Sequence, residues 1–291
     1  MTAALTRQIR ATVKTALAED LDQGDVTTSA LFPKPIHARA TVVAHQPMTV
    51  AGIAAAKQVF HAVDASLRII RSAKDGAKVQ RNRPVLVIEG DARSMLMAER
   101  VALNFLQHLS GIATLAAKFC DAVRGRRVKI LDTRKTAQGL RALEKWAVTL
   151  GGGHNHRYSL GDGVLIKDNH LELAGHDVAS ACRLARKRAP RRLQIEVEAT
   201  TLGEVRAALD GKADIILLDN MTAPAVKRAV KLIGNRATVE VSGGVTLANV
   251  RKIAAAGPSR ISIGALTHSV PAADLSMDIV PIQRRKGRRK Q

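Results

Sequence analysis

The chain has 291 residues and a formal net charge of +21, with 46% hydrophobic and only 2% aromatic residues. This length allows one large or two moderate domains with a buried core. No apolar run approaches the roughly 20 residues that a transmembrane helix needs. The N-terminal sequence MTAALTRQIR lacks the charged-then-apolar pattern of a signal peptide, and neither cysteine has metal-ligand or redox spacing, so we expect a cytoplasmic protein.

The N-terminal part of the chain predicts strands mixed with helices. The predicted elements are helices over 4–20, 53–63 and 94–123 and strands over 38–44 and 85–88. The acidic segment EDLDQGDVTT after the first helix is predicted as a turn-rich link, and Asp91 as the N-cap of the long helix. Three polar residues share one side of that helix, which by default faces solvent: Arg100, Asn104 and His108.

From residue 128 onward, short apolar runs alternate strictly with helical stretches. The runs are 128–131, 164–166, 193–197, 215–218, 238–241 and 260–263, and the helices between them are 138–150, 176–188, 201–209, 222–232 and 246–255. Strands that are apolar on both faces and separated by helices indicate a parallel sheet with right-handed crossovers.

Two topologies satisfy that alternation. A β/α barrel gathers functional side chains at the C-terminal ends of its strands, and each run here stops at a polar or small residue. Those residues are Asp132, Lys167, Glu198, Asp219, Ser242 and Gly264. Because only six strands are found, the barrel is incomplete, and an open doubly wound sheet remains the competing topology.

Four cations lie just past strand ends or in the loop between two strands: Arg134, Lys135, Arg157 and Lys167. Any one alone is more often a surface charge, but four in one continuous segment predict a pocket for polyanions. The planar guanidinium matches two carboxylate or phosphate oxygens, whereas lysine acts as a point charge. His156 beside them is a candidate hydrogen-bond donor to the ligand, and His154 and His170 are interpreted as structural.

Glycines and carboxylates complete the candidate site. Ser242, Gly243 and Gly244 follow one strand and Gly264 follows the next, where backbone N–H groups can approach phosphate oxygens. Glu198 and Asp219 end adjacent strands, so they are candidates to hold Mg²⁺ or ribose hydroxyls. Glu196 lies deeper on the same strand face, because side chains alternate with a period of two, and could be the buried partner of a lysine.

The basic charge also raises the possibility of nucleic-acid binding. Six of the charges lie in the tail 283–291, which we expect to be disordered, and a second cluster lies around 183–192. One Trp and one Tyr leave single-stranded nucleic acid almost no stacking partners, so a basic surface that attracts anionic substrates is the preferred interpretation.

Together, the ordered motifs resemble one family, quinolinate phosphoribosyltransferase, also called carboxylating nicotinate-nucleotide pyrophosphorylase. The motifs are EDLDQGDVTT, AERVALNFLQHLSGIAT, DTRKT, GGGHNHR, SLGDGVLIKDNH, EVE, LLDN, SGG and GALTHS, and the resemblance covers residues 19 to about 278. The resemblance implies an α/β fold with an N-terminal α/β sandwich domain over 1–105 and an incomplete, six-stranded β/α barrel over 106–272. It further implies that 273–291 packs back on the first domain or is disordered.

The resemblance also implies residue roles. Arg134, His156, Arg157 and Lys167 would bind quinolinate, and Lys135 would lie between quinolinate and pyrophosphate. Glu198 and Asp219 would hold ribose and Mg²⁺, with Ser242, Gly243, Gly244 and Gly264 on the phosphate. Lys135, Glu198 and Asp219 are then the candidate catalytic residues. Arg100 resembles the family arginine that reaches the neighbouring subunit's site, which implies at least a homodimer and changes the expectation for its helix side from solvent to interface.

The implied reaction is glycosyl transfer, in which quinolinate and phosphoribosyl pyrophosphate give nicotinate mononucleotide, pyrophosphate and CO₂ for NAD synthesis. Two alternatives stay open. One is a relative of the family with another acceptor or a role in molybdenum transport, against which the intact HNHR and KDNH segments argue. The other is a basic nucleic-acid-binding protein, which would show steeply salt-dependent binding.

Overall fold

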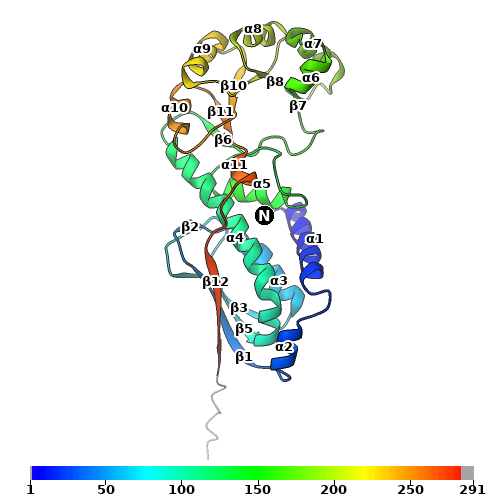
Figure 1. Cartoon of the computed structure of the whole chain (residues 1–291), viewed down its shortest axis with the longest axis vertical. Coiled ribbons are helices and arrows are strands. Elements are labelled where there is room, and N and C mark those ends of the chain that lie inside the picture. Colours follow the sequence, from blue (N-terminus) through cyan, green and yellow to red (C-terminus); the bar gives the residue numbers. More distant parts are fainter. Residues whose placement is uncertain (1, 283–291) are drawn as a thin grey trace, which may run out of the picture. The chain divides into compact units, whose positions relative to one another are not determined.

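The structure is a computed structural model that describes residues 2–282 (Figure 1). The expectations for the basic tail 283–291 fall outside the described residues. The chain forms two compact units that interleave along the sequence. Unit 1 takes residues up to Thr114, then Ala137–Gly151 and the segment from Val270 onward, whereas unit 2 takes Leu115–Thr136 and Gly152–Ser269. The domain limits inferred from the sequence stay a prediction.

Unit 1 is built around an antiparallel sheet of four strands in the order β12-β1-β5-β3. The strands of this sheet are β1 (His37–Ala44), β3 (Arg68–Ser72), β5 (Arg83–Asp91) and β12 (Leu275–Pro281). A separate two-stranded sheet is formed by β2 (Met48–Thr49) and β4 (Lys78–Val79). The helices of the unit are α1 (Ala3–Asp20), α2 (Val26–Leu31), α3 (Ile53–Val63), α5 (Arg141–Leu150) and the first part of α4 (Ala92–Ala122). β12 pairs with β1 from Ala38 to Ala44, so the last strand of the described chain forms one edge of the four-stranded sheet.

Local signals explain most of these elements. Thr2 caps α1 by accepting from Leu5 N, and Ile9 and Val13 form its buried side. Asp91 Oδ1 accepts from Arg93 N, as the N-cap predicted for α4 would. The predicted turn after α1 is wrong from Val26 on, because the Asp25 side chain accepts from Thr28 N and starts the short helix α2.

Unit 2 contains a parallel sheet of six strands in the order β6-β11-β10-β9-β8-β7. Its strands are β6 (Lys129–Leu131), β7 (Val164–Ile166), β8 (Ile195–Ala199), β9 (Ile215–Asp219), β10 (Thr238–Ser242) and β11 (Arg260–Ser262). Its helices are α6 (Asp168–Leu173), α7 (Val178–Arg188), α8 (Leu202–Asp210), α9 (Ala223–Ile233), α10 (Val250–Ala255) and α11 (Ala265–His268).

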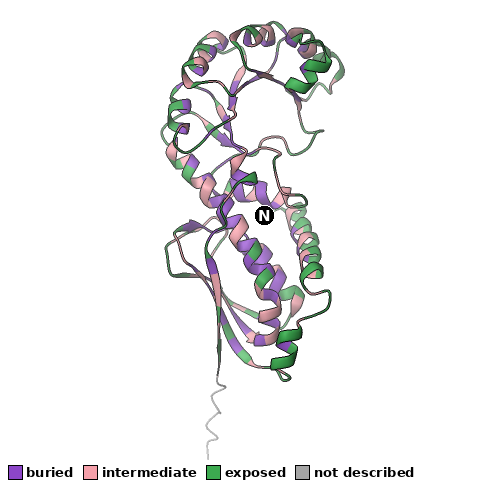
Figure 2. Ribbon diagram, in the orientation of Figure 1, coloured by how far each residue is buried: buried purple, intermediate pink, exposed green. Residues whose placement is uncertain are grey.

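This strand order decides between the two predicted topologies. From β7 to β11 each strand pairs with the next one along the chain, and β6 then pairs with β11. A doubly wound sheet would reverse its order at a switch point, whereas a sheet that closes on itself does not. Helices α7 to α10 lie in an arc outside the strands (Figure 1), and Figure 2 shows buried residues along the strands. The predicted six-stranded incomplete barrel is therefore confirmed.

The barrel is open between β6 and β7, which do not pair. The chain partly fills this opening with the segment that follows α5. His154 N donates to Ile130 O at 2.8 Å, and Asp132 N donates to His154 O at 3.1 Å, so His154 forms a single parallel bridge with β6. This bridge leads the next residues, Asn155 to Arg157, along the barrel.

Candidate active site

The predicted site residues of unit 2 line one cavity of about 680 Å³ at the C-terminal ends of the strands, called the mouth cavity below. The residues that the sequence predicted and the structure brings together here are Arg134, Lys135, His156, Arg157, Lys167, Glu198, Asp219, Ser242, Gly243, Gly244 and Gly264. This volume lies in the range of small-molecule sites. Arg100 does not line this cavity, because it lies on α4 in unit 1, where it is exposed.

Two arginines of the mouth cavity, Arg134 and Arg157, hold like charges close together. Burial and the charge of Arg134 both lower the pKa of Arg157. Arg157 Nη1 donates to Gly163 O at 3.1 Å, and Arg134 Nε is buried without a hydrogen-bond partner in the described part of the chain. An unsatisfied buried donor beside a second cation is costly unless an anion arrives. The pair is therefore arranged for an anionic ligand.

Lys135 is positioned through its backbone. Its N–H donates to Thr133 Oγ1 at 3.1 Å, and its carbonyl accepts from Thr267 Oγ1 at 2.7 Å. These bonds join the loop after β6 to α11. A Cβ atom on Gly264 would come within 3.1 Å of Lys135 Cδ, so glycine leaves the room that the lysine side chain needs.

Lys167 and the two predicted carboxylates, Glu198 and Asp219, lie at the ends of three neighbouring strands, β7, β8 and β9. Lys167 follows β7, and its Nζ donates to Glu198 Oε1 on the neighbouring strand β8. Asp219 ends β9 and accepts from Asn220 Nδ2 at 2.7 Å. His170, interpreted as structural, accepts from Lys167 N through Nδ1 at 2.9 Å and so caps the start of α6.

The predicted phosphate loop has backbone that requires glycine. Gly243 has φ +85°, and a Cβ atom there would lie 2.2 Å from Asn220 Oδ1 and 2.8 Å from Asn220 N. Gly244 also has a positive φ, of +60°. L-residues with side chains rarely adopt this backbone conformation. The two glycines let the chain turn tightly at the end of β10, which brings backbone N–H groups to the cavity.

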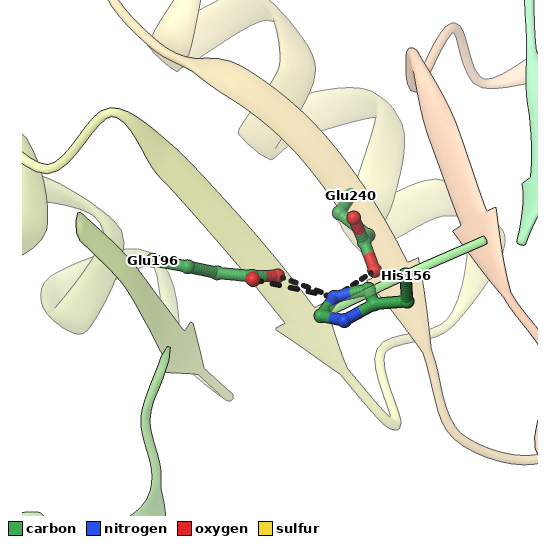
Figure 3. Close-up of side chains that lie close together, drawn as sticks. All are labelled: His156, Glu196 and Glu240. Carbon is green, nitrogen blue, oxygen red and sulfur yellow. Dashed lines mark hydrogen bonds and ion pairs between the residues drawn. The ribbon is translucent and has the colours of Figure 1, made fainter. Parts of the chain in front are cut away.

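A second layer of charged groups lies one step deeper in the barrel, below the mouth cavity. His156 Nε2 lies 3.3 Å from Glu196 Oε2 on β8 and 3.2 Å from Glu240 Oε1 on β10 (Figure 3). The three side chains are called the inner cluster. Burial alone would lower the pKa of His156, but the two carboxylates outweigh it and raise that pKa to about 9. Glu196 thus has a histidine as its partner here, where a lysine had been considered.

The backbone around His156 is fixed as well. Asp132, wholly buried after β6, accepts from His156 N at 2.8 Å. Arg157 N lies 2.8 Å from His156 Nδ1, so the ring lies against the backbone of Arg157 while Nε2 faces the two carboxylates. A smaller cavity of about 300 Å³ beside the barrel opening shares only His156 and Arg157 with the mouth cavity.

Sequence reasoning missed three residues here: Asp132 as the anchor of His156, Glu240 of the inner cluster, and His268 in the mouth cavity. A signal for Glu240 was present, because it precedes Ser242 by two positions and therefore shares its strand face. The same rule had already indicated Glu196 below Glu198. No sequence signal distinguished His268.

The residues of the predicted magnesium site offer suitable ligand atoms, but too few of them to complete the coordination shell of the ion. Glu198 and Asp219 supply hard oxygen ligands to the mouth cavity, as Mg²⁺ prefers. Within residues 2–282, the inner cluster is the only group of three metal-ligand side chains close enough to share an ion. Mg²⁺ usually keeps one or two carboxylates and completes its shell with water and substrate phosphates, which agrees with two acids and a glycine loop.

The fold and site define a β/α-barrel protein with a cation-lined mouth, paired carboxylates and a glycine loop, which are the parts of an enzyme that binds polyanionic substrates. Comparison with known proteins gives the family. Residues 25–110 match the N-terminal domain of quinolinate phosphoribosyl transferase, and residues 112–278 match its C-terminal domain. The chain belongs to the quinolinate phosphoribosyl transferase family.

Individual relatives agree with this assignment. The chain is 40% identical to the probable carboxylating nicotinate-nucleotide pyrophosphorylase of Bacillus subtilis, covering 90% of each chain. It is 42% identical to the corresponding protein of Mycobacterium leprae, covering 93% of this chain and 96% of that one. The crystal structure of nicotinate-nucleotide pyrophosphorylase from Ehrlichia chaffeensis has a TM-score of 0.90 and 37% identity, covering 96% of this chain and 99% of that one.

Within the described residues, no helix has the length and apolar character needed to span a bilayer.

Proposed function

We propose that the chain transfers a phosphoribosyl group from phosphoribosyl pyrophosphate to quinolinate with loss of one carboxyl group. The products are nicotinate mononucleotide, pyrophosphate and CO₂, as in the formation of NAD. The neighbouring cations Arg134 and Arg157 at the mouth of the barrel carry this proposal, because they suit a rigid dianion such as a pyridine dicarboxylate. Relatives named quinolinate phosphoribosyltransferase (decarboxylating) in Nicotiana tabacum, at 42% identity, support it.

In this proposal the cations position both substrates. Arg134, Arg157 and Lys167 hold the quinolinate carboxylates, and Lys135 lies between that site and the departing pyrophosphate. The pyridine nitrogen then attacks the anomeric carbon as the bond to pyrophosphate breaks. Cations beside the pyrophosphate stabilise the charge that develops on it. Orienting two bound substrates in this way accounts for a large part of such catalysis.

Carboxylates serve the ribose side. Charge on the anomeric carbon becomes positive as the leaving group departs, as in glycosyl transfer generally. Glu198 and Asp219 line the same cavity and would stabilise that charge and bind ribose hydroxyls. They would also hold Mg²⁺, which supplies positive charge to the pyrophosphate when bound. After nitrogen alkylation the ring is positively charged, so the electron pair left on the adjacent carbon by departing CO₂ is stabilised. That carbon then takes up a proton from solvent, which gives nicotinate mononucleotide.

The direct test is whether the purified protein, when given quinolinate, releases pyrophosphate and CO₂ in equal amounts. Nicotinate in place of quinolinate is the matched control, because it lacks the carboxylate that leaves as CO₂. Activity with nicotinate and none with quinolinate would instead indicate a family relative with another acceptor. Binding to nucleic acid that disappears when residues 283–291 are removed would belong to the tail alone.

We also propose a homodimer in which Arg100 completes the neighbouring subunit's site. Arg100 is exposed on α4 in unit 1 and is not among the residues that line the mouth cavity, which supports this assignment. Mixing the inactive variants Arg100→Ala and Lys135→Ala should restore activity, because each heterodimer regains one site with both residues. Arg100→Ala with full activity, or no recovery on mixing, contradicts the proposal. The cytoplasmic localisation stays a prediction.

A further inference from the structure

The inner cluster contains an acid whose presence the mouth cavity alone does not explain. Glu240 is wholly buried on β10 and does not line the mouth cavity. Among the described residues, its carboxylate forms ion pairs with His156 Nε2 at 3.2 Å and Arg260 Nη1 at 3.9 Å. Barrel interiors are usually filled by branched apolar residues, so a carboxylate here is a costly choice.

The contacts of Glu240 show that this buried carboxylate helps to hold the His156 ring in place. Glu196 and Glu240 approach the same ring nitrogen from two different strands, which fixes the plane of the His156 ring (Figure 3). The other ring nitrogen, Nδ1, lies 2.8 Å from Arg157 N. His156 therefore connects the acids of the barrel interior to the backbone of Arg157, whose side chain lines the mouth cavity. Both of its ring nitrogens are occupied by protein groups in this arrangement.

We propose that Glu240 is a positioning residue, which, through His156, holds Arg157 in the orientation that binds a quinolinate carboxylate. This inference rests on the function proposed above and adds a residue outside the substrate's reach to the binding of one substrate only. Phosphoribosyl pyrophosphate is proposed to bind the loops after β10 and β11. Glu240 lies on β10 itself, but its carboxylate faces His156, so its substitution should leave that binding unchanged.

The inner cluster also has the composition of a metal site, but its hydrogen bonds oppose that reading. A histidine that binds a metal must be deprotonated at the binding nitrogen. The two carboxylates raise the pKa of His156 to about 9, so at neutral pH Nε2 carries a proton and offers no lone pair to a metal. Positioning is the role that the contacts favour.

The test compares Glu240→Gln with Glu89→Gln in full-length protein. Glu89 is the matched control, because it too is a buried strand glutamate, held in unit 1 by Arg39 and Arg68. Loss of such a supporting partner typically costs about 10- to 100-fold. Glu240→Gln should raise the KM for quinolinate by about 10-fold or more while the KM for phosphoribosyl pyrophosphate stays unchanged. Glu240→Asp, which keeps the charge, should recover part of the loss.

A second measurement does not need activity. Proton NMR of the histidine ring signals should show the His156 pKa fall from about 9 toward 6.5 in Glu240→Gln but not in Glu89→Gln. Equal effects on both KM values, or kinetics like those of Glu89→Gln, overturn the inference. So does a transition metal bound one per chain in the wild type and lost from Glu240→Gln. Absence of quinolinate-dependent pyrophosphate release by the wild type refutes the proposed function instead, and leaves the NMR result to judge the Glu240–His156 contact.

Discussion

Replacing His156 by glutamine should destabilise the barrel unit strongly, because it leaves two buried carboxylates without their shared cation. The raised pKa of His156, from 6.5 to about 9, corresponds to about 3 kcal/mol of favourable interaction with the charged ring. Removing one partner of a buried ion pair typically costs about 3–5 kcal/mol. Both routes agree, and the ring is only 10% exposed, so solvent screens it little.

The sign of the pH dependence follows from the same shift. Because the folded-state pKa lies above the unfolded value, the stabilisation is complete below about pH 6.5 and disappears as pH rises through about 9. The wild type should therefore lose its advantage over His156→Gln across that window. Scanning calorimetry at pH 6, 7, 8 and 9.5 is the assay, with a deficit near pH 7 of about 10 °C in the midpoint of the barrel transition.

A second variant makes the reasoning refutable. In the His156→Gln/Glu240→Gln double variant the isolated carboxylate of Glu240 is gone, so part of the lost stability should return. Losses that simply add, or a His156→Gln protein that melts with the wild type from pH 6 to 9.5, would show that the inner cluster carries no net electrostatic interaction.

Three further outcomes are expected. Lys135→Ala should reduce kcat by about 100-fold or more while leaving the melting curve unchanged, because the lysine contacts the fold mainly through its backbone; retention of turnover contradicts the role proposed for Lys135. Gly243→Ala should lower stability by about 1–3 kcal/mol and raise the KM for phosphoribosyl pyrophosphate, since φ is +85° and the new Cβ would overlap Asn220; an unchanged KM contradicts a phosphate loop. Chelation of Mg²⁺ should abolish turnover and added Mg²⁺ restore it, with no change in the far-UV circular dichroism spectrum; full turnover in the chelator contradicts a role for the metal.

Much of unit 2 was predictable because its signals are local. A buried parallel strand reads as a short apolar run, and the residue after it falls at the C-terminal edge of the sheet, so Lys167 and Asp219 could be placed from the sequence. Strand β3, by contrast, was missed because RIIRS carries two arginines and is mostly exposed, and its pairing with β5 is a long-range contact. Sheet order, which excluded the doubly wound alternative, is also set by such contacts.

Partners inside the barrel were harder to predict than positions. Periodicity placed Glu196 below Glu198, but it did not show what would face it. The partner comes from a loop, because His154 bridges to β6 and Asp132 then fixes the backbone of His156. No propensity or spacing rule indicates that a loop will enter the opening between β6 and β7. The sequence therefore predicted which residues form the mouth, whereas only the structure revealed what supports them.

The carboxylates near Arg157 also explain how two neighbouring arginines, Arg134 and Arg157, are tolerated before substrate binds. Arg134 and Arg157 repel each other, and Arg157 is partly desolvated, so both effects work against the empty site. The charges of Glu196 and Glu198 act on Arg157 in the opposite direction and raise its pKa. An apolar barrel interior would bind a dianion as well or better, but it would leave the empty clamp unsupported. The buried carboxylates thus stabilise the arginines in the folded protein before substrate binds, and the arginines remain available to bind an anionic substrate.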